Sequence, residues 1–268
     1  MKNSQILIYR IKLILLSSLL SGISLAPAEA ASATATAIFG NFSSEGLTTT
    51  TGLIGTVQNS SAPFNNPKYL AHFNKSVGLL PHYPTPTLTV TANGIRSKIF
   101  SSGIQIDTAS TLADSAIDNT VISLALNPPP PTKSAQLYPQ PFLQITVNRL
   151  SSSSSFNRVF PNFTTPTGDT NIGFLQLSGS LINSKTPLQY KGHPSKDYVL
   201  FQNQQLTVTL NRQLIAALVS CTVGPSSGGC QTTAESITTD AINISITNAE
   251  IDGQAVSGEI NIGHTFAE

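Results

Sequence analysis

Charged side chains are scarce in this chain of 268 residues, where Asp, Glu, Lys and Arg together make up 10% of the sequence. Globular domains average about a quarter. The formal net charge is only +1. A nucleic-acid-binding protein needs a concentrated basic surface, and electrostatic docking to anionic lipid needs one too. We therefore expect neither nucleic acid nor an anionic lipid surface as a partner.

Sulfur-containing and indole side chains are also rare: the sequence has no Trp, one Met and two Cys. Cys221 and Cys230 lie in the stretch SCTVGPSSGGCQ, whose Gly, Pro and Ser residues allow the chain to bend back. A structural metal site would need a second pair of ligands close by, and the sequence offers none there. In an oxidising compartment two such cysteines bond to each other by default. The pattern predicts a Cys221–Cys230 disulfide, with no metal and no cofactor.

The motifs that usually mark an enzyme are missing or out of context. The sequence has no H-E-x-x-H, no Ser-x-x-Lys and no phosphate-binding Gly loop. A G-x-S-x-G match at 224–228 has Pro225 beside its serine and no helix after it, so we interpret it as a loop. Sparse carboxylates are interpreted as turn or solvated-face residues; they are Asp107, Asp114, Asp118, Asp240, Glu250 and Asp252. We expect no catalytic residue.

The four histidines lack the spacing of a metal-binding pair, and we interpret them as surface-loop residues: His72, His82, His193 and His264. Two of them stand near aromatic side chains within one segment. Imidazole and phenol groups together can form a binding pocket for a small polar ligand such as a glycan. The candidate binding residues are Tyr69, His72, Phe73, His82 and Tyr83.

The only long apolar run lies at the N-terminus and has the features of a signal peptide. Basic residues precede an apolar segment from Leu13 to Leu25, and APAEA places small residues for a cut before Ala31. The apolar segment is short for a membrane span, which needs about 20 residues. We expect a signal-peptide helix over 1–30 and a single β-rich domain over 31–268, with no membrane span. The domain would be secreted, extracellular or held in the cell envelope.

Strand patterns dominate the rest of the sequence. In DAINISITNAEIDGQAVSGEINIG (240–263), Ile242, Ile244 and Ile246 alternate with polar residues before an Asp-Gly pair. Similar alternation recurs in segments that begin near Leu88, Ile104, Val121, Leu143, Phe174 and Leu206. One apolar and one polar face are typical of antiparallel sheets. The predicted fold is all-β, an antiparallel sandwich or open barrel with long Pro- and Ser-rich loops.

Several segments lack a clear strand signal. We expect loops over Asn59–Pro86, over NPPPPTK (127–133) and over the serine run 151–155. Asn93-Gly94 indicates a turn, and short helical turns are expected in 109–117 and 210–220. LQITVNRL (143–150) resembles LTVTLNRQL (206–214), as two matched strands of one sandwich would.

Four segments resemble, in order, the bacterial extracellular "choice-of-anchor P" family: ASATATAIFGNFSSEGL at the mature start, SGIQIDTASTLADSAIDNTVISL, LTVTLNRQL and ITTDAINISI…GEINIGHTFAE. They cover about half of the mature chain. Arg212 stands where the family has an acidic residue, and Asn59–Pro86 has no counterpart there. The resemblance implies a secreted β-rich surface domain without assigned catalytic residues, and no site residue transfers from it.

The sequence therefore favours an exported β-domain with a structural or adhesive role rather than an enzyme. A glycan- or ligand-binding sandwich that uses the Tyr69 segment is the first alternative, and a secreted hydrolase is the second. Partners of the adhesive and binding hypotheses would be a surface glycan or another protein. A fourth hypothesis, an outer-membrane barrel, is disfavoured by the Pro- and Ser-rich interruptions.

Overall fold

The computed structural model describes nine stretches of the chain: 31–44, 46–60, 63–79, 85–102, 110–127, 141–157, 165–222, 229–251 and 253–268. Several predictions lie outside these residues. They concern the signal peptide, Ile104 and Ile106, the proline run from 128 onward, the G-x-S-x-G match, and His82 with Tyr83 of the candidate site.

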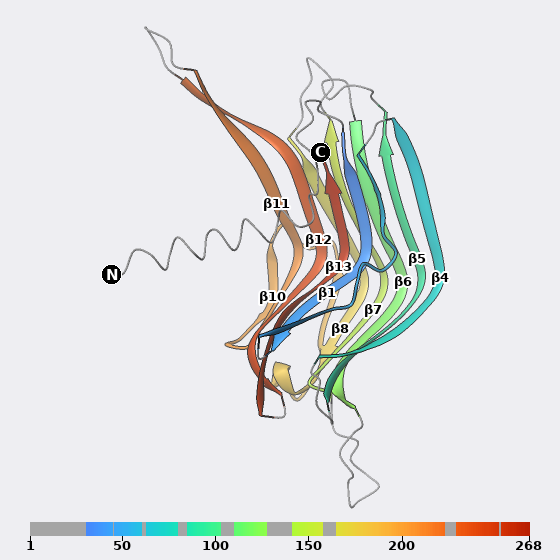
Figure 1. Cartoon of the computed structure of the whole chain (residues 1–268), viewed down its shortest axis with the longest axis vertical. Coiled ribbons are helices and arrows are strands. Elements are labelled where there is room, and N and C mark those ends of the chain that lie inside the picture. Colours follow the sequence, from blue (N-terminus) through green and yellow to red (C-terminus); the bar gives the residue numbers. More distant parts are fainter. Residues whose placement is uncertain are drawn as a thin grey trace, which may run out of the picture.

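The described residues form two antiparallel sheets that face each other (Figure 1). The seven-stranded sheet, here sheet A, has the order β10-β11-β12-β13-β1-β2, and β3 pairs with β1. Its strands are β1 (Ala33–Ser44), β2 (Leu47–Thr50), β3 (Val57–Asn59), β10 (Tyr198–Gln202), β11 (Leu206–Thr222), β12 (Gly229–Ile251) and β13 (Gln254–Ala267).

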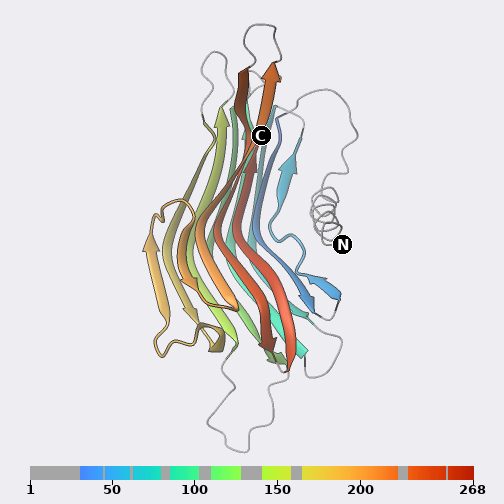
Figure 2. The ribbon, with the colours of Figure 1, turned by 90° about the vertical axis from the view of Figure 1, so that its left-hand side faces the viewer.

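The six-stranded sheet, sheet B, is a meander in which each strand pairs with the next along the chain. Its strands are β4 (Phe64–Gly78), β5 (Thr85–Ser101), β6 (Ser110–Asn127), β7 (Leu143–Asn157), β8 (Thr167–Ser178) and β9 (Leu188–Gly192). A short 3-10 helix (Ser180–Ile182) follows β8. No helix among the described residues is long and apolar enough to cross a membrane. The chain thus starts in sheet A, builds all of sheet B and returns, so that β13 lies beside β1 (Figure 2).

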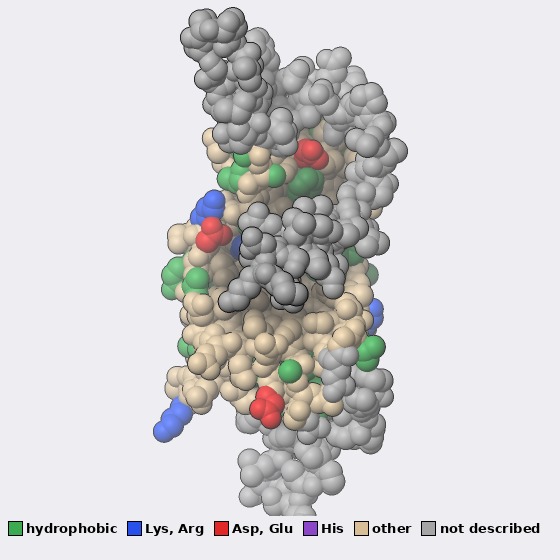
Figure 3. Space-filling model, turned by 60° about the vertical axis from the view of Figure 1, so that its left-hand side comes forward, with side chains coloured by type: hydrophobic (Ala, Val, Ile, Leu, Met, Phe, Trp, Pro, Cys, Tyr) green, Lys and Arg blue, Asp and Glu red, His purple; other side chains and the backbone are tan. Residues whose placement is uncertain are grey.

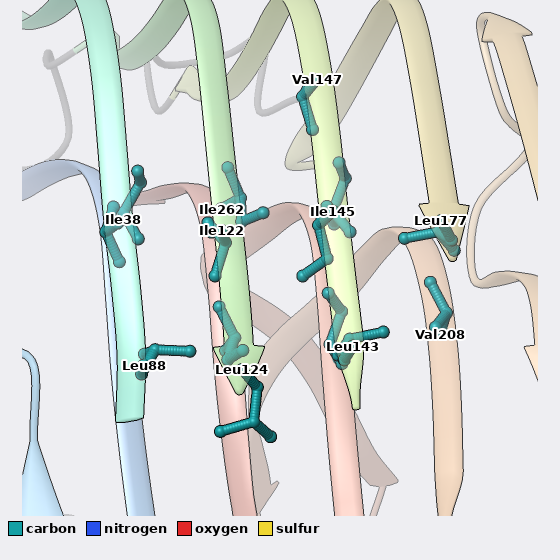
Figure 4. Packing of buried hydrophobic residues seen from close by; sticks show 14 of the residues in the cluster. Ile38, Leu88, Ile122, Leu124, Leu143, Ile145, Val147, Leu177, Val208 and Ile262 are labelled. Atoms are coloured by element: carbon teal, nitrogen blue, oxygen red, sulfur yellow. The ribbon is translucent and has the colours of Figure 1, made fainter. Parts of the chain in front are cut away.

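The predicted all-β sandwich is confirmed, and the alternating residues fill its interior. Ile242, Ile244 and Ile246 are buried, as are Ile260 and Ile262 on the neighbouring strand. In the segment that begins near Val121, Ile122 is buried and Val121 is 38% exposed. These aliphatic side chains meet those of sheet B across the gap between the layers (Figure 4). Burial of one such side chain stabilises the fold by about 1.5–3 kcal/mol.

The long strands of both sheets reverse their inside–outside alternation near their middle. On β7, odd-numbered residues are buried up to Val147 and even-numbered residues from Leu150 onward. On β13, even-numbered Ile260 and Ile262 are buried, and then odd-numbered Thr265 and Ala267. We call this point the pleat reversal. Successive side chains of a strand point to opposite faces. If one residue breaks this alternation, every later side chain of the strand points to the face opposite to the one expected.

The reversals line up across both sheets and depend on residues with positive φ. In sheet B, Gly94 has a φ of 63° and Arg149 one of 53°. In sheet A, Asn211 has a φ of 52° and Gly263 one of 67°. Each of these four residues lies between flanks that remain in register, such as Leu210↔Ile242 and Arg212↔Asp240, so the reversal at these positions is not caused by an inserted residue. Both layers bend along their length (Figure 1).

The interior has an aliphatic half and a small, hydroxyl-rich half on the two sides of the reversals. On β7 the buried residues are Leu143, Ile145 and Val147 before the reversal, but Ser152 and Ser154 after it. Ser154 Oγ donates to Thr239 Oγ1 of the opposite sheet at 2.9 Å and lies 2.8 Å from Thr265 Oγ1. Side-chain hydroxyl groups therefore hold the two sheets together in this half.

The serine run was predicted to be a loop, and this prediction is wrong. Residues 151–155 lie within β7, and alternate serines point into the interior. The loop expected over Asn59–Pro86 is also corrected, because β4 occupies Phe64–Gly78. The two segments lack the usual strand signal for different reasons. A narrow space between two sheets accepts small polar side chains, and an edge strand tolerates Pro67, so neither segment shows the usual apolar pattern.

The two helical turns and the Asn-Gly turn are likewise absent from the described chain. Residues 110–117 belong to β6 and 210–220 to β11. Asn93-Gly94 lies inside β5, at the pleat reversal. Gly94 has the positive φ that a hairpin turn would need, but here it is used in mid-strand. A β carbon on Gly94 would lie 2.1 Å from Asp118 Oδ2 on the next strand, which accounts for glycine at this point.

Candidate functional site

The pleat reversal of sheet A brings a row of charged side chains together on three neighbouring strands. Arg212 of β11 pairs in register with Asp240 of β12, which pairs with His264 of β13. The neighbours Thr239 and Thr265 are buried and bond to Ser154 between the sheets. Since side chains alternate along a strand, Asp240 and His264 lie on the outer face.

Asp240 is the fixed centre of this row. Its side chain is only 3% exposed, and His264 Nδ1 lies 2.6 Å from its Oδ1. A carboxylate accepts hydrogen bonds, so the imidazole donates to Asp240 through Nδ1–H. Arg212 Nη1 lies 3.8 Å from the other carboxylate oxygen. A buried charge needs such partners, and they hold it in one orientation.

A second row of amide and carboxylate groups continues the cluster. Asn243 pairs in register with Asn261, and Asn243 Nδ2 donates to Asn261 Oδ1 at 2.6 Å. Asn243 Nδ2 also donates to Glu259 Oε1, which accepts from Arg212 Nη1 at 2.6 Å. One guanidinium thus connects the two rows. We call the six side chains the polar ladder: Arg212, Asp240, Asn243, Glu259, Asn261 and His264.

The polar ladder has a buried base and a half-exposed rim. Asn243 and Asn261 are buried together with Asp240. Arg212, Glu259 and His264 keep 33%, 42% and 32% of their side chains exposed. The rim groups are oriented by buried partners and still offer free donor and acceptor positions to solvent. Phe39 and Phe266 flank the ladder, because Phe39 pairs with Asn261 and Phe266 follows His264 by two residues on β13.

Other charged side chains are few, as the composition predicts. Few Lys, Arg, Asp and Glu side chains are visible on the face shown in Figure 3, and most of its described surface is uncharged. On sheet B, Arg96 forms an exposed ion pair with Asp118. His193 lies 3.6 Å from Asp169, where both side chains are largely exposed. Among the described residues no three His, Cys, Asp or Glu side chains are grouped to hold a metal ion.

The described part of the predicted Tyr69 site does not converge. Tyr69 is 66% exposed on β4, and His72, also exposed, has its Nδ1 2.6 Å from Asn93 Oδ1. Phe73 instead packs against the aliphatic core. Phe73 is therefore separated from Tyr69 and His72, which lie on a strand rather than on a loop.

The backbone places the two cysteines directly opposite each other near the tip of the β11–β12 hairpin. The Gln213 amide donates to Asp197 Oδ1, away from β12, so by alternation the Cys221 amide also points away from β12. Cys221 and Cys230 then form a non-hydrogen-bonded pair, for which the Cα separation is about 4.5 Å. Disulfides need about 4.4–6.8 Å. The Cys221–Cys230 disulfide stays a prediction, and this register is compatible with it.

Asp114 of β6 lies in register with Lys98 and provides a titration test of the fold. Burial raises the pKa of Asp114 above its ordinary value of 3.8, and the attraction of Lys98 lowers it by less. A carboxyl group with a raised pKa in the folded state stabilises the protein most below its unfolded pKa, and this contribution is lost as the pH rises through the folded pKa. We expect Asp114→Asn to raise the thermal midpoint at neutral pH and to have little effect at about pH 3. A lower midpoint for the variant at neutral pH would contradict this assignment.

The polar ladder was missed by reasoning from the sequence. Asp240 was interpreted as a turn or solvated-face residue and His264 as a loop residue, and both interpretations are wrong, since the two lie side by side on central strands. A signal was present in the segments DAINIS and EINIGH, where the strict alternation breaks beside a charged residue. The repeated Asn-Arg of 148–149 and 211–212 also marks the reversal, once in each sheet.

No family model matches the chain, and searches of the curated proteins and of the solved structures gave no match either. The class of protein is therefore defined by the fold alone, as an antiparallel β-sandwich with a polar cluster on one outer face.

Proposed function

We propose that the chain is an exported, non-catalytic β-sandwich that binds a neutral, hydroxyl-rich ligand such as a glycan on the outer face of sheet A. The observation that carries the proposal is the polar ladder, in which side chains from three strands converge on one surface. The signal-peptide pattern of the first 30 residues supports export, and N-terminal sequencing of the released protein tests the cut before Ala31.

The chemistry of the ladder matches hydroxyl groups better than ions. A sugar hydroxyl both donates and accepts hydrogen bonds, and the rim offers guanidinium donors from Arg212 beside carboxylate acceptors from Glu259. The two signs of charge balance locally, so neither a strong anion nor a strong cation is favoured. Hydrogen bonds to charged groups contribute about 1.5–3 kcal/mol each, which is sufficient for recognition by a few contacts.

The ladder is also organised before any ligand arrives. Asp240 holds His264 by a 2.6 Å hydrogen bond, and Glu259 holds Arg212 at the same distance. The network is mounted on central strands, which position side chains more accurately than loops do. Preorganised groups lose little conformational entropy on binding. Phe39 and Phe266 beside the ladder can contribute apolar contact with a sugar ring.

A glycan array with the purified protein tests the proposal, followed by titration calorimetry on the best binder. We expect Arg212→Ala and Glu259→Ala each to weaken binding by about 10- to 100-fold, because each removes a charge-assisted hydrogen bond. Arg96→Ala is the matched control, since Arg96 flanks the reversal of sheet B in an exposed ion pair. The absence of any binder, or equal affinity in all three variants, would refute the proposal.

A secreted hydrolase is the second candidate, and the Asp240–His264 pair favours it. In a catalytic triad an imidazole is the general base, and a carboxylate that accepts a hydrogen bond from its Nδ1–H orients it. The same purified protein is to be assayed on a panel of esters and glycosides. Turnover that disappears in His264→Gln would replace the binding proposal, whereas His264→Gln protein that loses only affinity would support it.

A further inference from the structure

The β11–β12 hairpin continues beyond the sandwich as a two-stranded arm (Figures 1 and 2). Strand β13 pairs with β12 only as far as Ile237↔Ala267. Strand β10 pairs with β11 no farther than Tyr198↔Leu210. We call the projecting segments, 214–222 of β11 and 229–236 of β12, the arm. Two strands alone are only marginally stable in water, and a third strand or a packed face is usually needed.

The outer edge of β11 in the arm faces away from β12 and lies beyond the last residue that pairs with β10. Asp197 occupies this edge up to Gln213, because its amide donates to Asn211 O and its carboxylate accepts from the Gln213 amide. By alternation, the amides of Ile215 and Ala217 point the same way. Among the described residues no strand pairs with β11 there. The β11–β12 pairing shifts by one residue between Ala216 and Ala217, and the unpaired extra residue is Glu235 of β12. Strand β11 itself has no bulge, so its edge remains regular.

The side chains and composition of this segment are those of an interface. Residues 214–219 read Leu-Ile-Ala-Ala-Leu-Val, and no charged residue occurs from 213 to 222. Leu214 is 51% and Ile215 38% exposed, and both following alanines are exposed. An exposed, regular, apolar edge strand is the kind that pairs with another chain.

The opposite edge of the molecule shows how the same chain protects a strand that stays unpaired. Strand β4 carries Pro67, which lacks an amide donor. Lys68 Nζ donates to Thr56 O at 3.0 Å, and Lys75 Nζ donates to Thr51 O at 2.7 Å. Proline and lysine are the residues by which natural edge strands avoid pairing. The arm segment of β11 has neither proline nor lysine. It therefore lacks the features that protect β4 from pairing.

We propose that two copies of this chain associate by antiparallel pairing of their β11 arms about a twofold axis, forming a four-stranded ribbon. A segment without charge can pair with itself at no electrostatic cost, and an antiparallel pair of identical strands is self-complementary. The apolar segment 214–219 then lies in the middle of the ribbon, between the two β12 strands. The association is independent of the polar ladder and of any ligand.

Sedimentation equilibrium of the purified protein over a range of concentrations tests this proposal. We expect a monomer–dimer equilibrium whose dissociation constant rises at least about tenfold in Leu214→Lys, because a lysine charge without a partner is placed in an otherwise uncharged interface. Leu53→Lys is the matched control, since Leu53 is also 51% exposed but lies outside the arm. Ala217→Pro is expected to weaken the dimer similarly, by removing an outward amide while keeping the β11–β12 hydrogen bonds.

Circular dichroism is used to check that each variant is folded. If Ala217→Pro does not fold, the test of the dimer rests on Leu214→Lys. A wild-type protein that is monomeric at every concentration would overturn the proposal. So would a dimer unaffected by Leu214→Lys, or one weakened equally by Leu53→Lys.

Discussion

Gly263→Val is expected to lower the free energy of unfolding by about 3–5 kcal/mol, a large share of the roughly 5–15 kcal/mol typical of a domain. Gly263 has a φ of 67°, in the left-handed region that β-branched residues avoid. A β carbon there would lie 2.9 Å from Ala241 Cβ and 3.3 Å from both Leu150 Cδ2 and Ser152 Cβ of the opposite sheet. The substitution therefore strains the backbone and overfills the interior at once.

Gly253→Val separates these two effects. Gly253, in the turn between β12 and β13, has a φ of 76°, but its β carbon would have no atom within 4 Å. Only the backbone term then applies, at about 1–2 kcal/mol. Urea unfolding followed by circular dichroism gives both values. Equal losses in the two variants would show that the sheets do not pack closely over the pleat reversal.

Ser154→Val is expected to cost about 3 kcal/mol, although serine is usually an easily replaced residue. Ser154 is fully buried, and its hydroxyl group connects Thr239 Oγ1, Thr265 Oγ1 and Thr265 O. Valine removes these contacts, leaves buried threonine hydroxyls short of partners and adds volume between closely spaced sheets. Gly168 indicates how close the sheets are, since a β carbon on it would lie 2.1 Å from Thr239 Oγ1.

The neighbouring serine is the control for this variant. Ser153 lies on the same strand but faces away from the interior, so Ser153→Val is expected to change the unfolding free energy by less than about 0.5 kcal/mol. Thermal unfolding of both variants provides the measurement. If Ser154→Val were as stable as Ser153→Val, the hydroxyl-rich half would not hold the sheets together.

The strands with aliphatic residues could be predicted from the sequence because period-two alternation is a direct record of burial. Leu143, Ile145 and Val147 show it on β7, and Leu206, Val208 and Leu210 on β11. The same strands became unpredictable after the reversal. A run such as 151–155 is alternately buried, but serine on both faces carries no hydrophobic signal. The apolar stretch Leu214–Val219 likewise lacks alternation, since it projects beyond the sandwich.

The polar ladder could not be predicted for a different reason. Its members come from positions 212, 240–243 and 259–264, and only the pairing of β11, β12 and β13 in register places them together. Register depends on interstrand contacts that a single sequence does not specify. The pleat reversal adds to this, because it changes which residues of a strand share a face. Asn93-Gly94 shows the difficulty, because the pair was predicted to form a turn, whereas Gly94 uses its positive φ in the middle of β5.

The position of β1 beside β13 determines the order in which the two sheets can form. Sheet B is a meander of consecutive hairpins, so β4 to β9 can assemble as soon as each strand is synthesised. Strand β1 precedes all of them in the chain, yet its long-range partner β13, paired through Ile38↔Ile262, follows all of them. Strand β1, with its isoleucine and alanine side chains, therefore cannot pair with β13 until all strands of sheet B have been synthesised. Such a long-range closure makes folding slow and leaves apolar surface open to chaperones in the meantime.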